Sequence, residues 1–421
     1  MKHYAYKNEQ LHIENLSLKK IADEIKTPFY CYSQSAIQQA YHSYTDNLQQ
    51  LDSMICYAVK ANTNQAVIKT LADLGAGADV VSEGELRRAL LAGISPNKIV
   101  YSGVAKTENE ILFALAMNIY QFNVESENEL DLLNYLATKL NKIAVIAFRI
   151  NPNIDANTHE KISTGKAENK FGIPISKARD IYQKAATLSA IKIQGVDVHI
   201  GSQLTDLKPF KKTFERIKLL VSELKADGID ISVIDVGGGL GVNYEKEDNI
   251  EYNIADYCQL LVEIFFDSGC KILLEPGRSL VADSGLLVSK VVYKKQGEER
   301  VFLIIDAAMN DLLRPSMYDA YHDILSISEC HKTSTYDVVG PVCETGDTFA
   351  RNRTMANMNE GDLLAISSVG AYGSVMSSTY NTRLLIPEVL VKDDQYSVIK
   401  ARTSYEDLIN QDRLASWQQI S

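Results

Sequence analysis

The stretch "MICYAVK" (residues 54–60) places a lysine at the end of an apolar run. Residues 55–59 predict a buried β-strand, and Lys60 stands where this strand should stop. A lysine rarely enters a protein core without a partner, because moving its charge out of water is costly. Lys60 is therefore either a rim residue whose ammonium reaches solvent, or an amine kept in a pocket for chemistry.

Seven further strand-like runs follow this stretch and alternate with segments of helical periodicity. The runs are "GADVVS" (77–82), "KIVYSG" (98–103), "YQFNVE" (120–125), "KIAVIAFRIN" (142–151), "GVDVHIGS" (195–202), "SVIDVGGG" (232–239) and "KILLEPGR" (271–278). Helical segments between them include 127–140 and 210–228, and Ser82 with Glu85 has capping-box spacing. Such alternation predicts a parallel sheet with right-handed crossovers. Eight units predict a closed (β/α)8 TIM-like barrel, with an open doubly wound sheet as the alternative.

The placement of unusual polar and glycine residues favours the barrel. They cluster at the carboxyl ends of the predicted strands, where barrel enzymes assemble their sites. They are Lys60, Asp79, Arg149, His199, Ser202, Gly237, Gly238, Gly239, Glu275 and Arg278. The loops after the seventh and eighth strands often bind phosphate in barrels, and here these loops carry "GGGLG" and "EPGR".

The pattern changes after residue 280 to apolar strand runs with few helices between them. These runs predict a second, mainly β domain, and "TPFYCYS" (27–33) near the N-terminus predicts one more strand for it. We therefore expect a barrel over residues 36–280 and a β-rich domain formed by residues 1–35 and 281–421.

The composition excludes several classes of protein. A chain of 421 residues with 46% hydrophobic and 23% charged residues predicts two globular domains. The formal net charge of -11 argues against nucleic acid or an anionic membrane as a partner, since both need a basic face. No apolar leader or membrane-spanning run occurs, so we expect a cytoplasmic protein. Six scattered cysteines predict free thiols and no metal site.

Three motifs carry the chemistry of the predicted barrel. "DVGGGLG" (235–241) offers backbone N–H groups for an anion, although a tight turn is the simpler interpretation. "EPGR" (275–278) ends a strand in Glu275 and Arg278, which either pair with each other or leave the carboxylate for a protonated ring nitrogen. "HIGS" (199–202) offers an imidazole for stacking on a ring and a hydroxyl for a phosphate, although a lone histidine is more often a satisfied core residue.

An amine, an anion-binding turn, a carboxylate for a ring nitrogen and a flat stacking group together indicate a pyridoxal phosphate site. The motifs "YAVKAN", "HIGSQ", "DVGGGLG" and "EPGRSLVADSG" resemble those of fold-type III pyridoxal-phosphate decarboxylases of the alanine-racemase-like barrel class, over nearly the whole chain. Segments 307–322, 340–347 and 370–383 resemble the diaminopimelate decarboxylase family in particular. That family usually has serine where Thr345 stands, a small departure.

The resemblance implies a role for each of these positions. Lys60 would bond the cofactor's aldehyde, Glu275 would contact the pyridine nitrogen, and His199 would stack on the ring. The phosphate would be held by Ser202, Gly237, Gly238, Gly239, Gly277, Arg278 and Tyr372. Asp79 and Arg149 would support the site, and structural pairing is an equally good interpretation of both. A buried amine of lowered pKa would make Lys60 nucleophilic toward the aldehyde.

The resemblance also implies residues for the substrate, meso-diaminopimelate, which has an amino-acid group at each end. Arg278, Arg314 and Tyr318, with Tyr372 beside them, would bind the distal carboxylate, since guanidinium groups match carboxylates in shape. Glu344 would take the distal ammonium, and Cys343 would return a proton after carbon dioxide leaves. Without the resemblance, "PVCETGD" is an ordinary turn after a strand. The family further implies a homodimer with composite sites, whose β-rich domain carries the substrate and interface loops.

The expected function is conversion of meso-diaminopimelate to L-lysine and carbon dioxide, the last step of lysine biosynthesis. An ornithine, arginine or carboxynorspermidine decarboxylase is the alternative, although ornithine and arginine lack the distal carboxylate that Arg314 and Tyr318 would bind. Alanine racemases usually place an arginine at the ring nitrogen, whereas this chain has Glu275. A non-catalytic pyridoxal-phosphate carrier has no reason to contain a second domain with "CETGD".

Overall fold

The structure is a computed structural model and describes residues 3–155, 165, 170–244 and 253–418. The chain divides into two compact units. The barrel unit is Ile37–Val281, and the β unit combines Met1–Ala36 with Ala282–Ser421. Over the described ranges, no helix is both long and apolar enough to cross a membrane.

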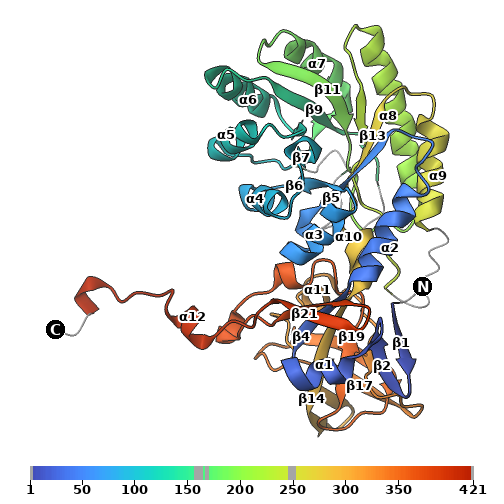
Figure 1. The fold of residues 1–421 in the computed structure, drawn as a ribbon, viewed down its shortest axis with the longest axis vertical. Helices are drawn as coiled ribbons and strands as arrows, with labels where there is room; N and C mark the ends of the chain where they lie inside the picture. Colours follow the sequence, from blue (N-terminus) through green and yellow to red (C-terminus); the bar gives the residue numbers. More distant parts are fainter. Residues whose placement is uncertain (1–2, 156–164, 166–169, 245–252, 419–421) are drawn as a thin grey trace. The chain divides into compact units, whose positions relative to one another are not determined.

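The barrel unit is built on eight parallel strands that close on themselves (Figure 1). In chain order they are β5 (Ser53–Ala58), β6 (Gly77–Val80), β7 (Ile99–Tyr101), β8 (Gln121–Val124), β9 (Ala144–Asn151), β11 (Ile191–Asp197), β12 (Val233–Asp235) and β13 (Lys271–Leu274). Each strand pairs with the next, and β13 pairs with β5 to close the ring. The alternative of an open doubly wound sheet is therefore wrong. The two-residue strand β10 (Ile173–Pro174) pairs with the end of β9.

A helix follows each barrel strand, and these helices lie outside the strands (Figure 1). They are α3 (Gln65–Asp73), α4 (Glu83–Leu91), α5 (Glu108–Met117), α6 (Glu127–Lys139), α7 (Ala178–Ala186), α8 (Lys208–Ala226), α9 (Ile254–Phe265) and the short α10 (Arg278–Val281). Helix α2 (Gln34–Thr45) precedes β5. The 3-10 turns of this unit are η1 (Val59–Ala61), η2 (Pro96–Lys98) and η4 (Ile175–Lys177).

Polar caps determine where several of these helices begin. The Ser82 hydroxyl accepts a hydrogen bond from the Glu85 N–H at the start of α4, as its spacing predicts. The Glu85 carboxylate accepts from the N–H of Val81 instead of closing the capping box on Ser82. Thr107 forms a complete capping box with Glu110 at the start of α5. Each cap satisfies a helix N–H that has no partner within the helix, and contributes about 1 kcal/mol.

The β unit contains two sheets. A three-stranded sheet joins β1 (Tyr4–Lys7), β2 (Gln10–Ile13) and β3 (Leu16–Ser17). The larger sheet has the order β18-β17-β15-β14-β4-β20-β21, with β16 and β19 beside β14. Its strands are β4 (Phe29–Ser33), β14 (Gly285–Gln296), β15 (Val301–Ile305), β16 (Ile324–Ser326), β17 (Thr333–Val339), β18 (Thr348–Ala356), β19 (Leu363–Ile366), β20 (Glu388–Lys392) and β21 (Gln395–Lys400).

The strand predicted over residues 27–33 is therefore β4, which lies between β14 and β20 in the larger sheet. Its buried side chains share a core with those of β14, β20 and helix α1 (Leu18–Ile25). The sheet β1–β3 and helix α1 were not predicted. The remaining helical segments of this unit are α11 (Arg314–Tyr318), α12 (Tyr405–Ile409), η5 (Ala282–Ser284), η6 (Ser374–Met376), η7 (Tyr380–Thr382) and η8 (Ser416–Gln418).

Candidate active site

Lys60 lies in η1, directly after β5, at the carboxyl end of the barrel. Its Nζ contacts Oδ2 of Asp79, on β6, at 2.5 Å. The Asp79 side chain is fully buried, whereas that of Lys60 is 37% exposed. The prediction of a buried amine is therefore wrong: the ion pair compensates the buried carboxylate and leaves part of the lysine side chain in contact with solvent.

The glycine run of 237–239 forms a turn pressed against neighbouring loops. A Cβ on Gly237, Gly238 or Gly239 would lie 2.2–2.4 Å from a backbone carbonyl oxygen, and Gly237 and Gly239 have φ of +64° and +108°. The N–H of Gly237 donates to Asp235 and that of Gly238 donates to Nδ1 of His199. Of the three N–H groups in the predicted anion-binding turn, only that of Gly239 makes no hydrogen bond to another described residue.

His199 follows β11 in the loop that the glycine turn contacts. Because its Nδ1 accepts the Gly238 N–H, the ring is neutral with its proton on Nε2. Burial lowers the pKa of His199 well below its usual value, and the positive charges of Arg149 and Lys60 lower it further. A neutral, planar imidazole in this position suits stacking on an aromatic ring better than an imidazolium would.

Arg278 begins the short helix α10 and is buried. Its Nη1 donates to the Tyr244 hydroxyl at 2.6 Å and its Nη2 donates to Ser202 Oγ at 3.1 Å. The preceding Gly277 leaves room for the turn, since a Cβ there would lie 3.0 Å from the Cβ of Ala61, the neighbour of Lys60. A guanidinium beside two hydroxyl groups is a suitable binding set for a phosphate. Tyr244 was not predicted.

Glu275 follows β13 and is buried. Its Oε1 accepts hydrogen bonds from Asn123 Nδ2 at 3.1 Å and Ser102 Oγ at 3.3 Å. The structure has no Glu275–Arg278 ion pair, so that alternative is wrong. Burial raises the pKa of Glu275 well above its usual value, and the charges of Asp235 and Asp79 raise it further.

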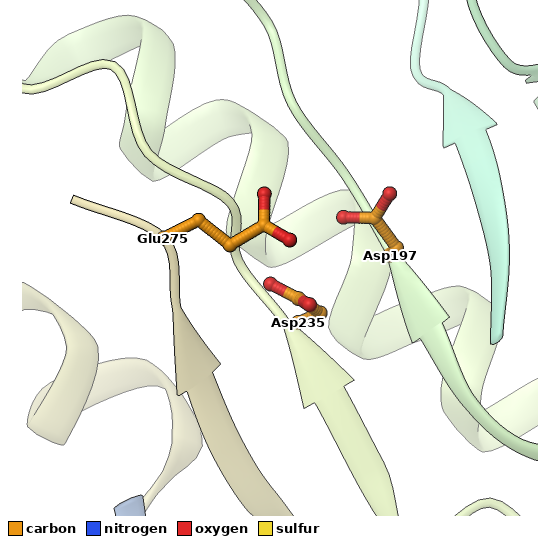
Figure 2. A group of neighbouring side chains, drawn as sticks. All are labelled: Asp197, Asp235 and Glu275. Atoms are coloured by element: carbon orange, nitrogen blue, oxygen red, sulfur yellow. The ribbon is translucent and has the colours of Figure 1, made fainter. Parts of the chain in front are cut away.

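Two more carboxyl groups lie beside Glu275. Asp197 ends β11 and Asp235 ends β12, and Figure 2 shows both side chains pointing toward Glu275. Carboxylate oxygens of the three residues lie within 4.8 Å of one another, and all three side chains are buried. Sequence reasoning missed Asp197 and Asp235, although both stand at strand ends inside motifs it had singled out. Pairing of β11 with β12 and of β12 with β13 brings them together.

Arg149 lies in β9 and forms a buried ion pair with Glu125 at 3.1 Å. Its guanidinium also lies over the ring of Phe171, 4.8 Å from the centroid. Structural pairing thus accounts for the burial of Arg149, as it does for Asp79. Supporting roles of the two residues toward a cofactor remain predictions.

The predicted substrate residues all belong to the β unit, except Arg278. Arg314, at the start of α11, is 6% exposed, and its Nη1 donates to Nε2 of His322 at 2.7 Å. His322 in turn donates from Nδ1 to the Ser367 carbonyl at 2.8 Å, which makes its ring neutral. Tyr318 ends the same helix and is partly exposed. Sequence reasoning missed His322, which ends the segment 307–322 that contains Arg314.

Cys343 and Glu344 are both exposed in the loop between β17 and β18. Buried Asp347 holds this loop, because its carboxylate accepts the N–H groups of Val342 and Met309 at 2.6 and 2.7 Å. Glu344 accepts a hydrogen bond from the Tyr380 hydroxyl. The turn expected without the resemblance is thus present, and its two chemically active side chains face solvent within the described chain.

Tyr372, in the loop after β19, has a φ of +56°, which non-glycine residues rarely adopt. The next residue, Gly373, fits against Tyr30 of β4, since a Cβ there would lie 2.9 Å from the Tyr30 hydroxyl. Tyr372 is partly exposed. Its contact with the cofactor phosphate stays a prediction.

The residues of the barrel unit fit pyridoxal phosphate. The turn of 237–239 has no space for side chains, Arg278 and Ser202 offer donors for a phosphate, and the neutral His199 offers a flat face. Glu275 offers a carboxylate for a ring nitrogen, and Lys60 offers an amine at the same edge of the barrel. All of these groups follow neighbouring strands of one closed barrel.

The comparisons with known proteins agree with this fit. The family described as "Pyridoxal-dependent decarboxylase, pyridoxal binding domain" matches residues 34–282. The diaminopimelate decarboxylase of Zymomonas mobilis is 45% identical over 98% of this chain and 99% of its own length. The structure of the Helicobacter pylori diaminopimelate decarboxylase complexed with L-lysine is 44% identical, with a TM-score of 0.90 over 93% of this chain and 98% of that one.

The M. jannaschii diaminopimelate decarboxylase structure has a TM-score of 0.95 at 37% identity and covers 99% of both chains. The match therefore includes the β unit, with its Arg314 helix and its 340–347 loop, as well as the barrel. A lysine decarboxylase structure from Selenomonas ruminantium, 22% identical, shares the fold. On the barrel, its cofactor-binding groups and these full-length matches, the chain belongs to the diaminopimelate decarboxylase family of pyridoxal-dependent decarboxylases.

Proposed function

We propose that this protein uses pyridoxal 5'-phosphate to decarboxylate meso-2,6-diaminopimelate, forming L-lysine and carbon dioxide. The observation that carries the proposal is the position of Lys60. It lies in η1, directly after β5, at the edge of the barrel where Glu275, His199, Arg278 and the glycine turn also lie. Relatives that match the chain over nearly its full length are named diaminopimelate decarboxylases.

Pyridoxal phosphate supplies an aldehyde for the substrate amine and a ring that accepts the electrons released when carbon dioxide leaves. Lys60 supplies the amine that holds the aldehyde, and Asp79 orients that amine through their 2.5 Å contact. His199 would cover one face of the ring without adding charge, because its Nδ1 is fixed as an acceptor by the Gly238 N–H. Glu275 would bond the ring nitrogen and would favour its protonated form.

The phosphate end is assigned to Arg278, Ser202 and the glycine turn. Arg278 brings a positive charge that two hydroxyl groups already orient. Gly239 brings the one N–H of its turn that is not used by another described residue. Gly237, Gly238 and Gly277 serve mainly by allowing close backbone approach. Tyr372 is a further predicted ligand of the phosphate.

The distal end of the substrate is assigned to the β unit. Arg314 binds the distal carboxylate, and the neutral His322 fixes its guanidinium by accepting one of its N–H groups. Tyr318, on the same helix, adds a hydroxyl, and Arg278 is a further predicted ligand of the distal carboxylate. Glu344 binds the distal ammonium, with its carboxylate oriented by Tyr380.

Cys343 protonates the carbon from which carbon dioxide has left. Its thiol is exposed, so a proton can reach it from solvent. We further propose a homodimer in which Cys343 and Glu344 complete the site of the partner subunit. The exposure of both side chains supports this arrangement, since exposed side chains can contact a second subunit. A cytoplasmic location stays a prediction of the sequence.

The test is substrate selection by the purified protein with added pyridoxal phosphate. Carbon dioxide release is followed with meso-diaminopimelate, ornithine, arginine and carboxynorspermidine as separate substrates. The proposal expects diaminopimelate to be favoured by a factor of a hundred or more in kcat/KM, about the value of one well-made ionic contact. Preference for ornithine, arginine or carboxynorspermidine would assign the chain to the alternative function.

A further inference from the structure

Among the described residues, no lysine, arginine or histidine forms an ion pair with the carboxyl groups of Asp197, Asp235 and Glu275. The cations that act on the group from a distance, Lys60 and Arg149, are paired with Asp79 and Glu125. Three negative charges within 4.8 Å of one another in a buried position would be strongly unfavourable without compensation.

Hydrogen-bond donors are distributed unequally over the group. Glu275 accepts from Ser102 and Asn123, and Asp235 accepts from the Gly237 N–H at 3.0 Å and from Asn123 at 3.3 Å. The buried Oδ1 of Asp197 has no hydrogen-bond partner among the described residues. Since donors stabilise an ionised carboxylate, Asp197 is the member least able to carry a negative charge, whereas Asp235 and Glu275 each accept from two donors.

Other ionisable groups also interact with the three carboxyl groups, but together they add no net positive charge. They are Cys56 on β5, Lys60 on η1, Asp79 on β6, Tyr120 before β8, Glu125 after β8, Arg149 on β9 and Tyr182 on α7. The two cations in this set are matched by the two carboxylates with which they pair. The cysteine and the tyrosines are neutral near pH 7, because burial raises their pKa.

We propose, on the basis of the proposed function, that Asp197 and Asp235 hold protons behind Glu275, so that Glu275 alone presents a negative charge to the cofactor's ring nitrogen. Asp197 and Asp235 are then positioning residues that act through Glu275. Their neutral forms remove two like charges from the neighbourhood of Glu275 and so let it ionise. An ionised Glu275 can accept a hydrogen bond from a protonated ring nitrogen, which is the electron-accepting form of the ring.

Burial raises the pKa of all three carboxyls, that of Glu275 included, so the assignment of the single charge to Glu275 rests on the protonated ring nitrogen that it would face. Burial, and then the charge of Asp197, raises the pKa of Asp235 to about 8. Burial, and then the charge of Glu275, raises the pKa of Asp197 well above its usual value. A pKa of about 8 makes Asp235 largely protonated at pH 7, and the pKa of Asp197 is shifted in the same direction.

The first test measures protonation in the apoprotein, independently of the cofactor. Infrared spectra at pH 7 should show carbonyl stretches of protonated carboxylic acids, and the difference between native protein and Asp197→Asn should show the loss of one such band. The matched control is Asp311→Asn: Asp311 is also a buried aspartate, but its pKa is raised only to about 6. It is therefore mostly ionised at pH 7, and its replacement should leave the band in place. A native spectrum without the band, or an unchanged band in Asp197→Asn, would overturn the proposal.

The second test follows the apparent Tm of the apoprotein with pH. The pKa of Asp235 rises on folding, from about 4 in the unfolded chain to about 8 in the folded protein. The folded protein therefore becomes less stable as the pH rises from about 4 to about 8. Asp235→Asn cannot ionise, so its Tm relative to the native protein should increase across this range and level off above pH 8. A difference that does not change with pH would overturn the proposal. The isosteric asparagine keeps the shape of the site, which limits misfolding.

The third test asks whether the network acts on the cofactor. In the holoprotein, the visible absorption of bound pyridoxal phosphate should change near pH 8, and this change should be absent in Asp235→Asn. If the cofactor binds but both proteins respond identically to pH, the proposal is wrong while the proposed function stands. If no pyridoxal phosphate binds, the proposed function fails together with the ring-nitrogen role, and the infrared band still decides the protonation of Asp197.

A cation site is the competing explanation for three carboxylates so close together. Titration of the native apoprotein with Mg²⁺ or Ca²⁺ should leave its Tm unchanged at millimolar concentrations. A rise in Tm that Asp197→Asn abolishes would show that the group binds a cation, and would overturn the proposal.

Discussion

The barrel rim and the loops of the β unit hold their functional side chains in different ways. At the rim, Glu275, His199 and Arg278 each form hydrogen bonds to other residues of the barrel unit. In the β unit, Arg314 is buried and fixed by His322, whereas Cys343 and Glu344 face solvent on a loop held from beneath by Asp347. The rim side chains are thus held in place within one unit, as binding of a cofactor in a fixed position requires. Two of the predicted substrate residues, Cys343 and Glu344, are exposed to solvent instead.

The barrel rim should therefore determine whether the reaction occurs, and the β unit should determine which substrate is selected. Changes at the rim should affect every substrate, because they alter the cofactor or the amine that holds it. Changes in the β unit should affect substrates according to their distal groups. The largest expected effect belongs to the rim.

Lys60→Ala should lower turnover by on the order of a thousandfold or more, because no other described amine follows a barrel strand at this position. Steady-state assays with saturating pyridoxal phosphate measure the loss. Borohydride treatment of the native protein should fix the cofactor on the peptide containing Lys60. The exposed Lys69→Ala, on the neighbouring helix α3, serves as the control and should keep native activity. Labelling of a different lysine would contradict the assignment.

Arg314→Ala should lower kcat/KM for diaminopimelate about 30-fold or more, since one charged contact to the distal carboxylate contributes about 2–4 kcal/mol. The measurement compares this variant with Arg351→Ala, an exposed arginine of β18 that should behave as native. Cofactor absorption should be unaffected in both. Equal losses for substrates with and without a distal carboxylate would show that Arg314 supports the fold instead of selecting the substrate.

Gly238→Ala should destabilise the barrel by about 1–3 kcal/mol, because its Cβ would lie 2.2 Å from the Glu275 carbonyl oxygen and force the backbone apart. Urea unfolding of the apoprotein measures this change, and equilibrium dialysis should show weaker binding of pyridoxal phosphate. Gly84→Ala, in helix α4 with no close backbone neighbour, is the control and should stabilise by about 0.5–1 kcal/mol. Similar stabilities of the two variants would mean that the turn adapts easily.

Mixing two inactive variants tests whether Cys343 and Glu344 belong to the active site of the partner subunit. Lys60→Ala and Cys343→Ala chains should each be nearly inactive, and mixed dimers should contain one intact composite site. Complete subunit exchange should restore up to roughly a quarter of native activity, since half the dimers are mixed and each has one working site. Mass measurement confirms exchange. Activity that stays at the level of the separate variants would place the whole site within one chain.

Much of the site could be predicted from local sequence. Strand ends are readable from apolar runs, so Lys60, His199 and Glu275 could be placed at the edge of the barrel without coordinates. The glycine run could be recognised because only glycine tolerates such close backbone contacts. The hydrogen-bond partners of its N–H groups could not be predicted. The family resemblance added the β unit's substrate residues, which no periodicity indicates.

The sequence by itself determined the order of strands and helices, the edge of the barrel that carries the site, and the position of the Lys60 amine directly after the first barrel strand. Only the tertiary structure decided that β13 pairs with β5, that Glu275 is not paired with Arg278, and that Asp197 and Asp235 lie beside Glu275. The physical reason is that strand registers and barrel closure bring together side chains distant in the chain. How deeply a side chain is buried, and whether its charge is compensated, then depends on these neighbours. The ion pair of the partly exposed Lys60 with the buried Asp79 is one example.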